Sequence, residues 1–176
     1  ATTRETFPQI GAMGYPIFVG LRGFDVPQVD ARLHVYRQAW REAGHAGQGD
    51  VFLRIPVYVA ATPERAYAEP QASTMRSYQR LAAQFAWTAG AAGTTADEER
   101  RERAERLAHV SYDDLLRDRL AYGSPDMVVK KLQHLQESLG LAGIVIEPNV
   151  GGGIPQPLVL QSVRLFAQEV APQLRP

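Results

Sequence analysis

The opening residues ATTRETF combine hydroxyl groups, a guanidinium group and the expected start of a helix. Thr2 or Thr3 is placed to act as the N-cap, and Glu5 follows Thr2 at the three-residue spacing of a capping box. The free N–H groups at such a helix start attract anions, and the helix dipole strengthens that attraction. Two interpretations are open: an ordinary capped helix, or a helix start that binds an anionic group of a ligand.

A second set of polar residues follows the expected strands at their carboxyl ends. Glu147 and Asn149 follow the last apolar strand, and Arg22 follows the first one. The carboxyl ends of parallel strands form the face at which barrel enzymes place their sites. These three residues are therefore candidates for binding a substrate, through a hydroxyl group at the carboxylate or an anion at the arginine. The alternatives are structural: Glu147 pairs with Arg54 or caps the neighbouring loop, and Arg22 faces solvent.

Other site chemistry is not indicated by the sequence. The glycine loop VGGGIP lacks the spacing of a dinucleotide-binding fingerprint, so it is either a close backbone approach to a ligand or a flexible turn. The histidines show no spacing typical of metal ligands, so we expect them to be structural or on the surface, with no metal site.

The composition excludes several classes of partner. Lysine plus arginine and aspartate plus glutamate each number 19, which gives a formal net charge of zero and no electrostatic basis for binding nucleic acid or an anionic membrane. The longest apolar runs are far shorter than the roughly 20 residues of a membrane-spanning helix. Cysteine is absent, which excludes disulfides and a cysteine nucleophile. We therefore expect a soluble cytoplasmic protein.

Alternating apolar and amphipathic segments predict a parallel α/β fold. The apolar runs predict strands near residues 15–20, 51–60 and 142–148. Amphipathic stripes and capping signals predict helices near residues 3–13, 26–43, 62–85, 124–139 and 156–171. The strand near 51–60 does not alternate polar with apolar residues, which predicts that both of its faces are covered, and Pro56 predicts a bulge or an unpaired position.

The small number of predicted strands indicates an incomplete sheet. Three parallel strands leave two unpaired edges, which native proteins cover or close. A (β/α)8 barrel closes such edges, but it needs about 250 residues. Since a helix comes first, the order also suits a barrel divided just after one of its strands. We interpret the 176 residues as the later part of a longer protein.

Residues 86–110 interrupt the alternation of strands and helices. Residues 86–96 are small, whereas residues 97–106 are highly charged, with opposite charges at i,i+4 spacing. We expect weak order at 88–96, because small residues lose backbone entropy on ordering and the charged helix has few apolar anchors. The segment is either a solvated surface helix on a flexible tether or a mobile lid over a site.

Several stretches together resemble the luciferase-like family of flavin-dependent oxidoreductases. In chain order they are ATTRETF, GAMGYPIFVG, YRQAWREAGH, RIPVYVA, YGSPDMVVKKLQHL, GIVIEPNVGGGIP and VRLFAQEVAPQLR. The resemblance covers nearly the whole chain except the charged insertion. It implies that residues 1–176 form the C-terminal half of a (β/α)8 TIM barrel, with an insertion at about 86–110.

The resemblance also implies a function. Members of the family bind reduced FMN or, in one branch, the deazaflavin F420, and many use molecular oxygen to oxidise an organic substrate. The implied activity is that of a flavin-dependent monooxygenase or oxidoreductase, with several reactive side chains in an N-terminal half outside this sequence. The alternative is a non-catalytic flavin-binding or assembly half-barrel.

Cofactor-binding residues follow from the resemblance as well. The family has a small hydroxyl residue in the opening segment and another three positions later, and both bind the flavin phosphate. Thr3 and Thr6 match these positions, and Thr2 and Arg4 complete the implied cofactor-binding set. The implied partners are the flavin, a small organic substrate, the N-terminal half of the barrel and further copies of the chain in a homo-oligomer.

Overall fold

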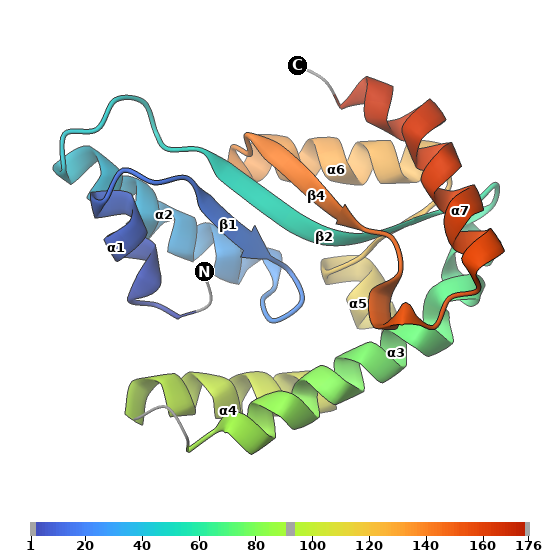
Figure 1. Cartoon of the computed structure of the whole chain (residues 1–176), viewed down its shortest axis with the longest axis horizontal. Coiled ribbons are helices and arrows are strands. Elements are labelled where there is room, and N and C mark those ends of the chain that lie inside the picture. Colours follow the sequence, from blue (N-terminus) through green and yellow to red (C-terminus); the bar gives the residue numbers. More distant parts are fainter. Residues whose placement is uncertain (1–2, 91–93, 175–176) are drawn as a thin grey trace.

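Parallel strands form the sheet at the centre of the structure (Figure 1). The computed structural model describes residues 3–90 and 94–174. The strands are β1 (Ile17–Gly20), β2 (Val51–Val59), β3 (Ala121–Gly123) and β4 (Gly143–Glu147). Every pairing among them is parallel, which confirms the three predicted strands and their orientation. The short strand β3 is an addition to the prediction.

The other three strands all pair with β2. Residues 51–54 pair with β1 and residues 52–56 pair with β4, so β1 and β4 flank β2 on opposite sides. The last residues of β2, 57–59, pair with β3. Pro56 lies between the ladders with β1 and β3, so neither of these ladders requires the N–H group that proline lacks. The register with β4 continues through Pro56, so the alternative expectation of a bulge is wrong.

Helices lie on several sides of this sheet (Figure 1). They are α1 (Thr6–Ala12), α2 (Val26–Glu42), α3 (Pro63–Thr88), α4 (Thr94–Ala108), α5 (Tyr112–Asp118), α6 (Pro125–Leu139) and α7 (Gln156–Leu165). Three short helical turns, η1 (Val150–Gly152), η2 (Phe166–Val170) and η3 (Ala171–Gln173), occur near the carboxyl end. None of the helices in the described ranges is long and apolar enough to cross a membrane.

One face of the sheet packs against α2 and α6. Val19, Leu53 and Ile55 project from the strands into a buried core, which also contains Leu33 of α2 and Leu132 of α6. Burying each of these aliphatic side chains contributes roughly 1.5–3 kcal/mol, so this layer supplies much of the stability of the fold.

The opposite face of the sheet is exposed. The register places Phe18 of β1 opposite Phe52 of β2, and the two-residue alternation of strands puts Val145 of β4 on the same face. Their exposed fractions are 47%, 36% and 43%, and we call these three side chains the open face. The predicted covering of both faces of β2 is therefore correct for residues 55–59 and wrong at Phe52.

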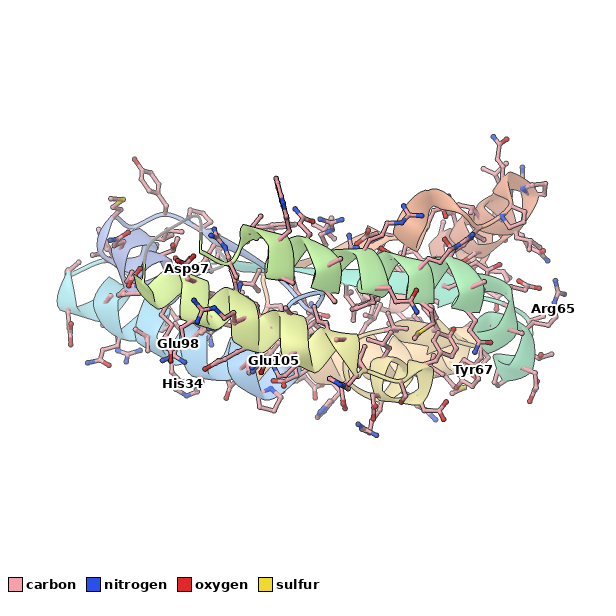
Figure 2. All side chains as sticks on the ribbon, turned by 90° about the horizontal axis from the view of Figure 1, so that it is seen from below. His34, Arg65, Tyr67, Asp97, Glu98 and Glu105 are labelled. Carbon is pink, nitrogen blue, oxygen red and sulfur yellow. The ribbon has the colours of Figure 1, made fainter. Side chains whose placement is uncertain are left out.

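The segment after β2, which includes the insertion, is mostly helical. Helices α3 and α4 run side by side, as both views show (Figures 1 and 2). The weak order expected at 88–96 falls partly on residues 91–93, which lie outside the described residues, and Thr94 already belongs to α4.

Helix α4 is not a solvated surface helix. Its side chains Asp97, Glu99 and Arg103 are buried together with Ala104 and Leu107. The solvated interpretation is wrong because the charged side chains of α4 form ion pairs with residues of α4 itself and with arginines outside it. Opposite charges can be buried when each has a partner.

Lys131 of α6 fixes the carboxyl end of α5. Its Nζ donates to the carbonyl oxygens of Leu116 at 2.6 Å and Arg117 at 2.9 Å. Burial lowers the pKa of Lys131 from 10.5 to about 8. Between these values the unfolded chain binds more protons than the folded chain, so the contribution of Lys131 to stability increases with pH in this window.

A Lys131→Met variant should therefore lose part of the rise in stability between neutral pH and pH 10.5. We expect a difference of about 1–3 kcal/mol, measured as the free energy of unfolding in urea at both pH values. Lys130→Met is the matched control, because Lys130 is the exposed neighbour on the same helix. Identical pH profiles for the two variants would contradict this assignment.

Candidate functional site

Charged side chains from three strands meet at one end of the sheet. Arg22 follows β1, Arg54 lies in β2 and Glu147 ends β4. Glu147 Oε2 lies 2.9 Å from Arg54 Nη2, and Glu147 Oε1 lies 3.4 Å from Arg22 Nη1. Arg22 Nη2 donates a hydrogen bond to Ser77 Oγ of α3 at 2.6 Å. We call these four residues the strand-end cluster.

The parallel register explains how residues so distant in sequence come together. Gly20, Arg54 and Val145 are aligned across β1, β2 and β4. Glu147 lies two residues after Val145, so it shares the face of the sheet that carries Arg54. The structure thus brings together two of the predicted site residues, Arg22 and Glu147, and also forms the ion pair of Glu147 with Arg54 that was the structural alternative.

The loop that carries Arg22 is fixed by a residue that the sequence did not single out. Arg119 Nη1 donates to the carbonyl oxygens of Leu21 at 3.4 Å, Arg22 at 3.4 Å and Phe24 at 2.9 Å. Arg119 is buried, and this burial lowers its pKa. Neither Arg119 nor Ser77 belongs to a motif, and they reach the site from the end of α5 and from α3, so no sequence signal indicated them.

A cavity of about 350 Å³ opens beside the strand-end cluster. Its aromatic and cationic lining side chains are Phe18, Phe24, Phe85, Arg22, Arg54 and Arg103. Apolar walls with a few fixed polar groups are typical of sites for small organic molecules. The described part of the chain has no group of three or more His, Asp or Glu side chains placed to hold a metal ion.

Two buried hydrogen-bond donors around the strand-end cluster lack partners among the described residues. They are Arg22 Nε and the hydroxyl oxygen of Tyr78 on α3. Burial raises the pKa of Tyr78, so its hydroxyl stays protonated and able to donate. Arg22 and Glu147 both act electrostatically on Tyr78. An unpaired buried donor is costly unless a ligand or water completes it, so Arg22, which lines the cavity, is suited to contact a bound molecule.

Asn149 has a contact within its own loop. Its Oδ1 accepts a hydrogen bond from Ile154 N at 3.1 Å, which closes the glycine loop after β4. Gly153 N in the same loop donates to Ser73 Oγ of α3 at 2.9 Å. Asn149 thereby holds the loop at the carboxyl end of β4, and its substrate-binding role stays a prediction.

The opening segment places two hydroxyl groups together. Thr3 Oγ1 and Thr6 Oγ1 lie 2.6 Å apart. Helix α1 begins at Thr6 with Glu5 as N-cap and no side-chain cap, so the predicted N-cap at Thr3 is wrong. The reason is a turn before the helix, in which Thr6 N donates to Thr3 O. Thr2 lies outside the described residues.

Arg4 is directed to the insertion. Its Nε lies 3.1 Å from Glu99 Oε1 of α4, and its side chain is 70% exposed. The cofactor-binding roles of Thr3, Arg4 and Thr6 stay predictions.

Solved structures share this architecture. The oxygenating constituent of 3,6-diketocamphane monooxygenase from Pseudomonas putida, solved with FMN, has a TM-score of 0.67 and 21% identity, with 96% of this chain and 45% of that chain covered. Monooxygenase RslO1 from Streptomyces bottropensis has a TM-score of 0.64 and 20% identity, with 99% of this chain and 46% of that chain covered. The coenzyme F420-dependent tetrahydromethanopterin reductase from Methanopyrus kandleri has a TM-score of 0.62 and 16% identity, with 99% of this chain and 50% of that chain covered.

These likenesses establish the fold. The chain has the fold of part of a (β/α)8 barrel, and it spans about half the length of each of the three structures. A comparison with curated protein sequences gives no significant match. The family model described as luciferase-like monooxygenase matches residues 1–142, which is well over half of the sequence. The chain therefore belongs to the luciferase-like monooxygenase family.

Proposed function

We propose that residues 1–176 form the C-terminal half of the barrel of a flavin-dependent oxidoreductase, with an insertion at about 86–110. The enzyme uses reduced FMN with molecular oxygen, or alternatively the deazaflavin F420, to oxidise an organic substrate. The observation that carries the proposal is the strand-end cluster beside an aromatic cavity, in a chain of the luciferase-like family.

The cavity beside the cluster fits an aromatic ligand chemically. Phe18, Phe24 and Phe85 offer apolar surface to a planar ring system. Arg22 Nε, which is buried without a partner among the described residues, is available to donate to a carbonyl oxygen. The flavin, when bound, supplies the electron transfer, and the protein binds it, orients it and excludes water.

The polar residues of the site then have distinct roles toward the substrate. Glu147 is held between Arg22 and Arg54, so its carboxylate is fixed to accept a hydrogen bond from a hydroxyl or N–H group. Arg22, which lines the cavity, donates to an oxygen atom of the substrate. Asn149 fixes the loop at this end of β4 and adds an amide to the substrate site.

The opening segment is proposed to bind the cofactor phosphate. The hydroxyls of Thr3 and Thr6 are close enough for a single phosphate group to accept hydrogen bonds from both. Thr2 and the exposed Arg4 complete the site, the latter by adding positive charge near the phosphate.

A double variant with Thr3→Ala and Thr6→Ala tests this assignment. Hydrogen bonds to a charged phosphate contribute about 1.5–3 kcal/mol each, so the loss of both should lower FMN affinity at least about a hundredfold. Riboflavin, which lacks the phosphate, should bind the variant and the parent equally in fluorescence titrations. Thr88→Ala is the control, because the Thr88 hydroxyl donates within its own helix. Equal losses for FMN and riboflavin would refute the phosphate assignment.

Cofactor use is tested by spectral titration of a chain that carries the complete barrel. FMN, reduced FMN and F420 are added separately, and the proposal expects saturable binding of either the flavin or the deazaflavin. Binding of none of the three would overturn the proposed function.

A non-catalytic half-barrel that assembles with another chain is the second candidate. The open face favours it, because Phe18, Phe52 and Val145 are exposed on one surface that a second chain could cover. A mass measurement during size-exclusion chromatography distinguishes the two. A stable homodimer of the 176-residue chain supports the second candidate, and a monomer argues against it.

A further inference from the structure

A second cavity lies between α4 and the pair formed by α1 and α2. Its volume is about 370 Å³. Figure 2 shows this side of the molecule, with Glu98 of α4 and His34 of α2 labelled. The charged side chains that line the cavity are Arg4, Arg32, Arg103, Arg106, Glu99 and Glu102. We call it the arginine cavity.

The arginine cavity has an excess of positive charge. Glu99 Oε1 lies 3.1 Å from Arg4 Nε, and Glu99 Oε2 lies 3.0 Å from Arg103 Nη2 and 3.9 Å from Arg32 Nη2. One carboxylate is therefore shared by three guanidinium groups. Glu102 pairs with Arg106 at 3.6 Å. Four guanidinium groups against two carboxylates leave two positive charges among the lining residues.

Arg32 is held rigidly with a donor unused. Its guanidinium lies 4.5 Å from the ring centre of Phe24 and 5.6 Å from that of Phe7. Its Nη1 is buried and has no hydrogen-bond partner among the described residues. Burial lowers the pKa of Arg32, and the positive charges of Arg4 and Arg106 lower it further against the effect of Glu99. A bound anion would supply both the missing acceptor and the missing charge.

We propose that the arginine cavity binds a small organic dianion of the phosphate-monoester class, as a ligand separate from the flavin. Two excess positive charges match a dianion, and guanidinium groups are well suited to bind phosphate oxygens. Phe7, Ala31 and Val35 form the apolar part of the lining, which suits the organic part of such a ligand.

The arginine cavity adjoins the two sites proposed above and shares Arg4 with the opening segment. Neither Thr3 nor Thr6, the pair assigned to the cofactor phosphate, lines it. Arg103 lines both this cavity and the one beside the strand-end cluster, so it forms part of the wall between them. A dianion bound here lies next to the cavity beside the strand-end cluster without occupying it.

Calorimetric titration of the full-length protein with phenyl phosphate tests the proposal. At constant ionic strength, Arg106→Gln should weaken binding about tenfold, because it removes one charge-assisted contact from a partly exposed side chain. Glu102→Gln should strengthen binding about threefold, since it removes a competing negative charge. Arg101→Gln is the control, because Arg101 is exposed on the same helix and does not line the cavity. Inorganic phosphate should bind more weakly than phenyl phosphate.

Two results would overturn the proposal. The first is an affinity that Arg106→Gln leaves unchanged or that Arg101→Gln lowers equally, which would show unspecific attraction to positive charge. The second is loss of phenyl phosphate binding when the protein is saturated with FMN, which would show that the cavity takes the cofactor phosphate. The first titration contains no flavin, so its outcome is independent of the proposed enzymatic function.

Discussion

Replacing Phe52 with lysine is expected to destabilise a complete barrel far more than it destabilises this chain. Phe52 is 36% exposed on the open face, where lysine can extend into water. In a closed barrel the inward-facing side chains are packed in layers, so the same substitution removes a buried aromatic ring and places a charge in the core. We expect a loss of about 3–5 kcal/mol in the complete barrel and about 1 kcal/mol or less in the 176-residue chain, measured by urea unfolding.

Leu160→Lys is the matched control for this comparison. Leu160 lies on α7, is 48% exposed and is not part of the sheet. This control substitution should lower the free energy of unfolding only slightly in both chains. A small effect of Phe52→Lys in the complete barrel would show that the open face is not the barrel interior. A large effect in the 176-residue chain alone would indicate that copies of the chain cover this face.

The open face also shows where pattern reading succeeded and failed for the strands. Continuous apolar sequence in β2 correctly predicted a strand, because both halves of β2 carry residues that need burial. It could not show that the described residues leave Phe52 exposed. Hydrophobicity indicates that a side chain is suited to burial, whereas its neighbours decide whether it is buried.

The helices were predictable where a single apolar stripe faces a core. Helix α6 carries Val128, Leu132, Leu135 and Leu139 on its buried side, and its bounds agree with the predicted 124–139 to within one residue. Strand β3 has only three residues and follows a short helix. Such short segments cannot show the repeat of apolar residues that identifies a strand or a helix. Helix α4 was assigned correctly, but its buried charges could not be foreseen because their partners lie outside the helix.

For the candidate site, the sequence identified end-of-strand residues and missed their supports. Parallel strands place Arg22 and Glu147 at the same edge of the sheet, which the topology alone predicts. Ser77 and Arg119 hold Arg22 and its loop through contacts that depend on how α3 and the segment after α5 pack. These contacts join residues that are separated by 55 and by 97 positions in the sequence, and no local pattern encodes them.

Replacing Glu99 with glutamine is expected to loosen α4 from α1 and α2. Glu99 is the carboxylate that Arg4, Arg32 and Arg103 share, and its side chain is only 10% exposed. Removing one partner of a buried ion pair leaves the remaining charges uncompensated, which costs about 3 kcal/mol. The cost falls on Arg103 above all, because its side chain is 5% exposed and burial already lowers its pKa to about 10.

Hydrogen exchange distinguishes loosening of α4 from general destabilisation. In the Glu99→Gln variant, the amides of α4 should exchange faster than those of α2 and β2, because the lost contacts join α4 to its surroundings. Glu105→Gln is the control, since Glu105 is an exposed residue of α4 (Figure 2) that contacts His109 Nδ1 through its backbone carbonyl oxygen. Equal exchange in the two variants would mean that burial of Ala104 and Leu107, rather than the shared carboxylate, holds α4 in place.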